Sequence, residues 1–264
     1  IAIIDELIKR GHKVDIITSG NNSQLKLPFK PIAVKNGLSF FYDNNGGIDW
    51  FKTIKKLKLR SFLSEIKFDV SKYDLVISDF EPISAWSAKK YGVKSIGIGN
   101  QYSILSKKVP RPSNPNKISE KFIKLFAKCD HTIAIGYHKY DTFIYHPIIR
   151  KEIYSKIIEN DDFYLVYLPS KEYSVIAETF SIEKVKCKIY SPEIKKDSRI
   201  GTAELKKMDD ESFKNDLLSC KGILTASGFS TTSEALVLGK LLWSIPLKGQ
   251  YEQICNAIAL KKMG

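Results

Sequence analysis

Short apolar runs alternate with longer segments of helical periodicity along almost the whole chain. The runs at 74–80, 93–100, 163–170 and 222–227 are largely apolar and show no strict alternation over their whole length. Such runs are typical of strands that are buried on both faces of a parallel sheet. The pattern therefore predicts an α/β protein whose parallel sheets are covered by helices on both sides.

The alternation comes in two series, separated by residues 137–161, which show no clear periodicity. Because single domains usually stop growing at about 150 to 200 residues, a chain of 264 residues is expected to form two lobes. We expect a lobe over 1–150 and another over 151–264, each a doubly wound Rossmann-like sheet, facing each other across a ligand-binding cleft.

In the first lobe the expected helices are 1–10, 50–66, 83–92 and 118–126, and the expected strands 14–18, 74–80, 93–100 and 131–135. In the second lobe the expected strands are 163–170, 184–191, 222–227 and 241–247, and the expected helices 171–180, 211–220, 231–239 and 251–264. The chain opens inside a helix without Met and stops where another helix usually follows, so we expect it to be truncated at both ends.

The chain is basic, with 42 Lys and Arg against 29 Asp and Glu and a net charge of +13. This charge attracts polyphosphates, nucleic acid or an anionic membrane surface without choosing among them. Since no zinc-finger spacing or RNA-stacking signature accompanies the lysines, we interpret most of them as a solvated face and do not expect nucleic acid as a partner.

The four cysteines (Cys129, Cys187, Cys220 and Cys255) form no C-x-x-C motif. They are expected to be reduced, buried thiols of a cytoplasmic protein. No run of about 18 apolar residues and no signal pattern occurs, which leaves peripheral attachment to the inner face of the membrane as the form of membrane contact still open.

The most informative segment is 222–234, where a buried strand ends in Ser227-Gly228-Phe229 and a helix is expected to begin at Ser230 or Thr231. Gly228 is expected to allow a sharp turn and a close approach to a ligand. The free N–H groups at the start of the helix make an anion site that suits a diphosphate. Ligands of open α/β sheets collect at these strand ends.

Glu234 lies one turn into that helix and has two interpretations. Its carboxylate is placed to accept hydrogen bonds from the vicinal hydroxyls of a ribose. Alternatively, Thr231 to Glu234 form a capping box in which Glu234 satisfies a backbone N–H group.

A second ligand-suited turn follows the next strand, where Gly249 precedes Gln250, Glu252 and Gln253. Amide and carboxylate side chains at this point suit sugar hydroxyls. The alternative is a solvated first turn in which Glu252 favours the helix dipole and Gln253 and Asn256 face water.

These residues resemble a known family. The runs SGFSTTSEALVLGK and IPLKGQYEQICNA are similar to the donor-binding half of GT-B glycosyltransferases, in particular the group around the family 28 C-terminal domain, which includes the peptidoglycan N-acetylglucosaminyltransferase and archaeal relatives. SDFEP at 78–82 and GIGNQY at 97–102 also resemble strand ends of this group. The resemblance covers both lobes and is most specific over 222–257.

The resemblance implies an enzyme that takes a sugar from a nucleotide diphosphate sugar, with a UDP-sugar as the expected donor. The C-terminal lobe would bind the donor and the N-terminal lobe the acceptor. No metal or other cofactor is expected, since the helix start stabilises the departing diphosphate. The donor-binding residues implied are Ser227, Gly228, Phe229, Ser230 and Thr231 around the diphosphate, Glu234 at the ribose, and Gln250, Glu252 and Gln253 at the sugar or the phosphates.

Two departures from the family pattern stand out. Relatives often carry His-Gly-Gly where this chain has Ser227-Gly228-Phe229. A direct contact from a histidine to the phosphates is therefore not expected at this place. The glycine-rich turn in which many relatives keep the general base would lie before Ile1.

An inverting transfer needs a base that removes the proton of the acceptor hydroxyl. Asp79 and Glu81, at the end of the strand at 74–80, are the candidates. Asp79 would act directly or orient a missing histidine, as a carboxylate does in a triad, with the alternative that Asp79 caps the following helix. Asn100 and Gln101 are candidates for binding the acceptor, which would be a glycan or a lipid-linked sugar, or else for forming a turn.

Two other functions remain open at this point. One is a nucleotide-sugar 2-epimerase of the same two-lobe architecture, against which the Gln250-x-x-Gln253 pattern favours transfer. The other is a non-catalytic nucleotide-sugar-binding subunit.

Overall fold

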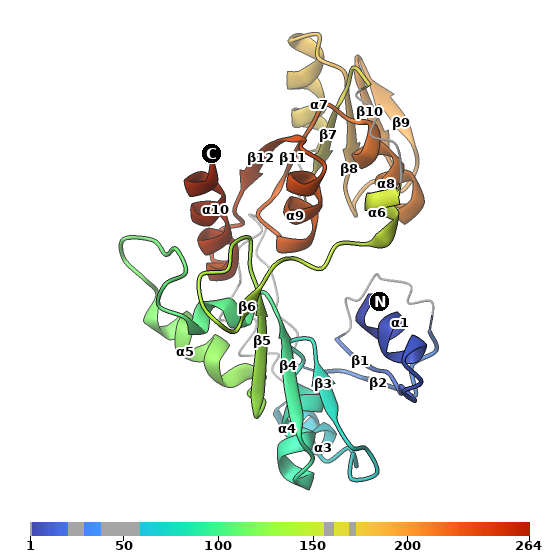
Figure 1. The fold of residues 1–264 in the computed structure, drawn as a ribbon. Helices are drawn as coiled ribbons and strands as arrows, with labels where there is room; N and C mark the ends of the chain where they lie inside the picture. The colour runs from blue at the N-terminus through green and yellow to red at the C-terminus, as the bar shows by residue number, and fades with distance from the viewer. Residues whose placement is uncertain (1, 21–28, 38–58, 156–160, 169–172) are drawn as a thin grey trace. The chain divides into compact units, whose positions relative to one another are not determined.

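The structure is a computed structural model, and it describes residues 2–20, 29–37, 59–155, 161–168 and 173–264. These residues fall into two compact units (Figure 1). Unit 1 ends at Ile148, and unit 2 runs from Ile149 to Gly264. The acceptor and donor roles assigned to the two lobes stay predictions.

Unit 1 contains a four-stranded parallel sheet in the order β3-β4-β5-β6 and a separate parallel pair, β1-β2. Its elements are α1 (Ala2–Lys9), β1 (Ile17–Ser19), β2 (Ala33–Lys35), α3 (Leu59–Glu65), β3 (Val76–Ser78), α4 (Pro82–Tyr91), β4 (Ser95–Gly99), the 3-10 helix η1 (Gln101–Leu105), α5 (Lys117–Phe126), β5 (His131–Ile135) and β6 (Ile144–Tyr145). Of the helix predicted at 50–66, residues 50–58 lie outside the described residues.

The local sequence explains where α4 begins and ends. Glu81 is its N-cap, and Pro82 occupies the first turn, where the missing N–H group costs nothing. Gly92 ends the helix in the left-handed conformation, with φ of 66°, which glycine adopts without strain. These signals make α4 begin close to the end of β3. Because β3 and β4 are parallel neighbours, the ends of both strands lie together at this place.

A glycine in β4 makes room for an aromatic ring. A Cβ atom at Gly97 would lie 2.5 Å from the ring of Tyr102, which is 3% exposed and donates its hydroxyl to the Ala127 carbonyl at 2.6 Å. The ring also contacts Phe80 edge to face, with ring centroids 5.3 Å apart. Tyr102 therefore fixes the turn that follows β4, which carries Asn100 and Gln101.

Unit 2 contains one six-stranded sheet in the order β12-β11-β7-β8-β10-β9. Its elements are α6 (Lys151–Ser155), β7 (Tyr164–Tyr167), α7 (Tyr173–Ile182), β8 (Cys187–Tyr190), β9 (Ser198–Ile200), β10 (Ala203–Lys206), α8 (Asp210–Ser219), β11 (Gly222–Ala226), α9 (Phe229–Val237), β12 (Leu241–Ile245) and α10 (Tyr251–Met263). All neighbouring strands are parallel except β9, which pairs antiparallel to β10. The chain winds outward from β7 and then crosses back to β11, which makes this a doubly wound sheet, as predicted.

Both faces of the unit 2 sheet are covered near its centre. Leu165 and Val166 are successive residues of β7, and both are completely buried. Leu165 packs in a core with Phe213 and Leu217 of α8, whereas Val166 packs with Ala177 of α7 on the opposite face. This confirms the prediction of strands buried on both faces.

The sequence pattern missed the shortest elements, among them β2, β6 and the β9-β10 hairpin. One expectation about the cysteines is also corrected, because Cys129 is only half-buried, while the other three thiols are buried and all four are free. Within the described part of the chain no helix is long and apolar enough to cross a membrane.

Candidate functional site

The carboxyl ends of β11 and β12 lie side by side in unit 2. Ala226 and Ile245, the last residues of these parallel strands, are paired in register. Helix α9 begins three residues after the end of β11, at Phe229, and α10 begins at Tyr251 after a short turn. Two helix starts therefore stand at adjacent strand ends, as the sequence pattern indicates for a ligand site in an open sheet.

Ser227 supports this arrangement from inside. Its side chain is completely buried, and its hydroxyl lies 2.7 Å from the Ser244 hydroxyl. The Asn256 amide, 6% exposed, donates to the Ser227 carbonyl at 3.1 Å. This corrects two interpretations: the Ser227 hydroxyl is committed to the protein rather than open to a diphosphate, and Asn256 does not face water.

Gly228 is the N-cap of α9, with an ordinary φ of −69°. The sharp turn expected there does not need glycine, because other residues adopt this conformation easily. However, a Cβ atom at Gly228 would meet nothing within 4 Å. The space ahead of the α9 first turn is therefore open, and Ser230 is exposed beside it, with Phe229 and Thr231 half-buried.

Glu234 does not cap the helix, so the capping-box interpretation is wrong. Helix α9 starts earlier than the box requires, and its cap, Gly228, makes no side-chain hydrogen bond. Instead the Glu234 carboxylate, 7% exposed, accepts two hydrogen bonds from Arg150, from Nε at 2.7 Å and from Nη2 at 2.9 Å. Sequence reasoning missed Arg150 because it lies in a stretch without periodicity.

Gln253 organises the turn before α10. Its Oε1 accepts a hydrogen bond from the Leu247 backbone N–H group at 2.9 Å, and its Nε2 donates to Gln250 Oε1 at 2.8 Å. The alternative that Gln253 merely faces water is therefore wrong. Glu252 is half-buried beside it. The Gln253 amide therefore orients the Gln250 side chain.

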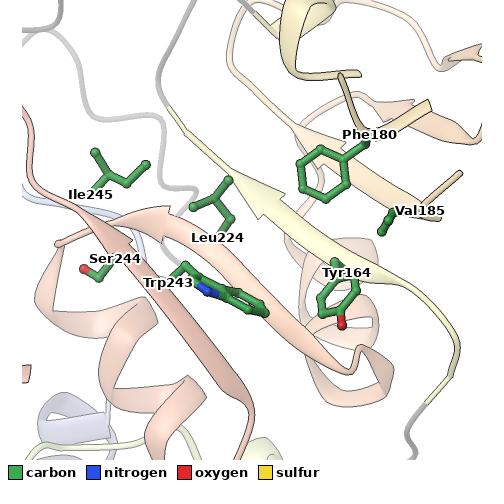
Figure 2. A pocket seen from close by; sticks show the side chains of 7 residues that line it. All are labelled: Tyr164, Phe180, Val185, Leu224, Trp243, Ser244 and Ile245. Carbon is green, nitrogen blue, oxygen red and sulfur yellow. The ribbon is translucent and has the colours of Figure 1, made fainter. Parts of the chain in front are cut away.

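A large apolar hollow in unit 2 is distinct from these helix starts. It has a volume of about 560 Å³ and lies over the sheet face formed by β7, β11 and β12, where Tyr164, Leu224 and Trp243 line it (Figure 2). Its lining is almost entirely apolar, so it does not suit a diphosphate. We therefore place the candidate site at the starts of α9 and α10 rather than in this hollow, which reaches the end of β12 at Ile245.

In unit 1, Asp79 and Gln101 meet around Gly99, at the ends of β3 and β4. A Cβ atom at Gly99, whose φ is 157°, would lie 3.5 Å from Asp79 Oδ1 and 3.0 Å from Gln101 Oε1. The Asp79 side chain is exposed, yet neighbouring protein desolvates its carboxyl group and raises its pKa above the ordinary value. The next residue, Phe80, has a strained φ of 48°.

Glu81, rather than Asp79, caps α4. Its carboxylate accepts hydrogen bonds from the backbone N–H groups of Ile83 and Ser84, both at 2.7 Å, and from the Ser19 hydroxyl at 2.7 Å. The alternative role of helix cap therefore belongs to Glu81. Because both of its oxygens are engaged in this way, Glu81 is poorly suited to act as a base.

Asn100 is buried at the end of β4, with 7% of its surface exposed. Its amide nitrogen donates to the Ile135 carbonyl at 2.9 Å, whereas no group among the described residues donates to its Oδ1. Asn100 is the N-cap of η1, but its side chain makes no capping hydrogen bond, so the turn interpretation does not account for its side chain.

No group of three or more His, Cys, Asp or Glu that could hold a metal ion occurs in the described ranges.

The chain matches the family described as glycosyl transferase family 1 over residues 2–264. The protein belongs to this family. It is thus a glycosyltransferase, and the two Rossmann-like units are those of the GT-B fold. The narrower resemblance to the family 28 group stays a prediction. No curated protein sequence matches the chain.

Solved structures show the same fold. The glycosyltransferase is similar to Arabidopsis thaliana UGT89C1 complexed with UDP-L-rhamnose, with a TM-score of 0.58 and 14% identity over 98% of this chain and 78% of that one. It is also similar to the same Arabidopsis protein complexed with quercetin, with a TM-score of 0.56 and 14% identity over 99% and 78% of the two chains.

Proposed function

We propose that this glycosyltransferase moves a sugar from a UDP-sugar to the hydroxyl group of an acceptor, with the donor on unit 2 and the acceptor on unit 1. The observation that carries this proposal is the start of α9 at the carboxyl end of β11, with open space at Gly228 and the Glu234 carboxylate in the next turn. The similar Arabidopsis protein binds UDP-L-rhamnose, which supports a UDP-sugar as the donor.

The donor diphosphate would lie ahead of α9. The first turn of a helix carries N–H groups without intrahelical acceptors and a positive dipole end, both of which stabilise an anion. The exposed hydroxyl of Ser230 and the partly exposed hydroxyl of Thr231 add donors at this place. Since this charge stabilisation favours the departing diphosphate, we propose that the reaction needs no metal ion.

Asp79 is the proposed general base. The acceptor hydroxyl oxygen would form a bond to the anomeric carbon while the bond from that carbon to the diphosphate oxygen breaks, and Asp79 would take the hydroxyl proton. This displacement inverts the anomeric configuration. The raised pKa of Asp79 supports the role, because a carboxylate with a higher pKa is a stronger base.

Asn100 and Gln101 are the proposed acceptor contacts. The free Oδ1 of Asn100 and the neighbouring carboxylate of Asp79 are both hydrogen-bond acceptors, which suits a hydroxylated compound. The similar Arabidopsis protein was crystallised in complex with quercetin, which is a hydroxylated compound. In this chain we propose a glycan or a lipid-linked sugar, bound at the cytoplasmic face of a membrane, where the charge of +13 would favour anionic lipid.

The proposal is tested with a panel of nucleotide sugars, scored by thermal shift and by release of free nucleoside diphosphate, with and without EDTA. We expect one UDP-sugar to stabilise the protein, Glu234→Ala to lose that shift, and UDP release to continue in EDTA. No shift with any nucleotide sugar would remove the donor-site assignment, and loss of turnover in EDTA would remove the metal-free mechanism.

The reaction product distinguishes sugar transfer from the two other functions, the 2-epimerase and the non-catalytic subunit. A 2-epimerase returns an epimerised nucleotide sugar and transfers nothing, whereas a non-catalytic subunit binds the donor without releasing UDP. NMR of the glycosylated product reports whether the anomeric configuration is inverted.

A further inference from the structure

Arg150 forms a bidentate ion pair with the Glu234 carboxylate. The guanidinium donates from Nε to Oε1 at 2.7 Å and from Nη2 to Oε2 at 2.9 Å, so the two planar groups face each other as a fork. Arg150 is the second residue of unit 2, and Glu234 lies in the second turn of α9, so both partners belong to one compact unit. The Glu234 side chain is only 9% exposed.

A second carboxylate forms an ion pair with the same guanidinium. Asp210, the first residue of α8, lies 3.3 Å from Arg150 Nη1 and is exposed. The hydrogen bonds to Glu234 and the nearby negative charges raise the pKa of Arg150 further above its already high ordinary value. Arg150 therefore keeps its charge and has one preferred orientation.

The fork leaves Glu234 with acceptor capacity. Each oxygen of an ionised carboxylate has two lone pairs, and Arg150 occupies only one on each. The two lone pairs that remain point outward on opposite sides of the carboxylate, so either one can accept a hydrogen bond from a single hydroxyl group. Without Arg150, a carboxylate this deeply buried would lose its charged partner and its fixed orientation.

We propose that Arg150 is a positioning residue for the donor nucleotide, which orients the Glu234 carboxylate so that one of its free lone pairs accepts the 2′-hydroxyl of the ribose. The inference rests on the proposed function, since it takes the donor to be a ribonucleoside diphosphate bound at the start of α9. It makes Arg150 a determinant of the preference for ribose over deoxyribose.

The test is calorimetric binding of UDP and of 2′-deoxy-UDP to the whole chain. We compare the wild type with Arg150→Gln, Glu234→Gln and the double variant, and include Arg150→Lys, which keeps the charge but not the fork. Arg199→Gln is the matched control, because Arg199 forms an exposed ion pair with Glu204 elsewhere in unit 2. Thermal unfolding of each variant reports whether it is folded.

We expect the wild type and the control variant to prefer UDP by roughly tenfold or more, as for hydrogen bonds to a charged group. Arg150→Gln and Glu234→Gln should each reduce the preference toward one, and the double variant should lose little more than either. Arg150→Lys should stay folded but recover only part of the preference, since a lysine contacts a carboxylate as a single point.

The outcomes distinguish a failure of the role of Arg150 from a failure of the ribose site at Glu234. If Glu234→Gln loses the preference while folded Arg150→Gln or Arg150→Lys keeps it in full, the role of Arg150 is refuted and the donor site stands. If the wild type binds neither nucleotide, or binds both equally, the placing of the ribose at Glu234 fails, and the role of Arg150 fails with it.

Discussion

The hydroxyl oxygens of Ser227 and Ser244 lie 2.7 Å apart, at the ends of the neighbouring strands β11 and β12. This partly buried contact links the two strand ends that precede the starts of α9 and α10. The site therefore depends on a polar contact beneath it as well as on the residues that would touch a ligand.

Removing both partners of this contact should cost less than the sum of removing each partner alone. Ser244→Ala leaves the buried Ser227 hydroxyl without this partner, and we expect a loss of about 1 to 3 kcal/mol in the free energy of unfolding. The double change to alanine should cost less than the sum of the single changes. Chemical denaturation of the three variants measures this, and strict additivity would show that the contact contributes nothing.

Gly228→Ala should affect the ligand rather than the fold. The added Cβ meets no atom within 4 Å, and the φ of −69° suits alanine. The midpoint of thermal unfolding should therefore change little, because the gain from a less flexible unfolded chain is offset by the lower preference for alanine than for glycine at a helix N-cap. The methyl group would occupy the open space ahead of α9, so UDP affinity should fall. Gly239→Ala is a useful contrast: it also has free space, but its φ of 64° predicts a loss of stability. Unchanged UDP affinity in Gly228→Ala would argue against a diphosphate at this place.

Asp79→Asn should abolish turnover while UDP still binds, because unit 2 is unchanged. Its effect on stability depends on pH. The folded-state pKa of Asp79 is raised, so ionising Asp79 destabilises the folded protein as pH rises from the ordinary carboxyl pKa through the raised value. The variant should therefore unfold at a higher temperature than the wild type at pH 7, and the difference should shrink as the pH falls below the ordinary value. Thermal unfolding measured across pH tests this, and a constant difference would contradict it.

Glu81→Ala should destabilise the protein without removing the chemistry. Its carboxylate caps α4 through Ile83 and Ser84, and loss of a helix cap costs about 0.5 to 2 kcal/mol. We expect turnover per folded molecule to stay near the wild-type value, measured well below the unfolding temperature. If instead a fully folded Glu81→Ala is inactive while Asp79→Asn is active, the base is Glu81.

Much of the fold was predictable from local pattern. Largely apolar runs and helical periodicity located nearly all the long elements, and His131–Ile135 was placed to the residue. The elements that were missed, such as Ala33–Lys35, Ile144–Tyr145 and Ala203–Lys206, are two to five residues long, too short for a period to develop. The strand ends near the candidate site were also predictable from local pattern, because a strand followed directly by a helix start is a local signal.

The roles of the carboxylates were not predictable in this way. Asp79 and Glu81 differ by two positions in the sequence, yet one is desolvated beside Gly99 and the other caps a helix. The partner of Glu234 is Arg150, 84 residues earlier in the chain. The alternation of strands and helices, and the sheet edge where a ligand would bind, can be predicted from the amino-acid sequence, because both follow from short-range periodicity. The pairing of the polar groups is visible only in the folded protein, because hydrogen bonds form between groups that folding brings together, whatever their separation along the chain.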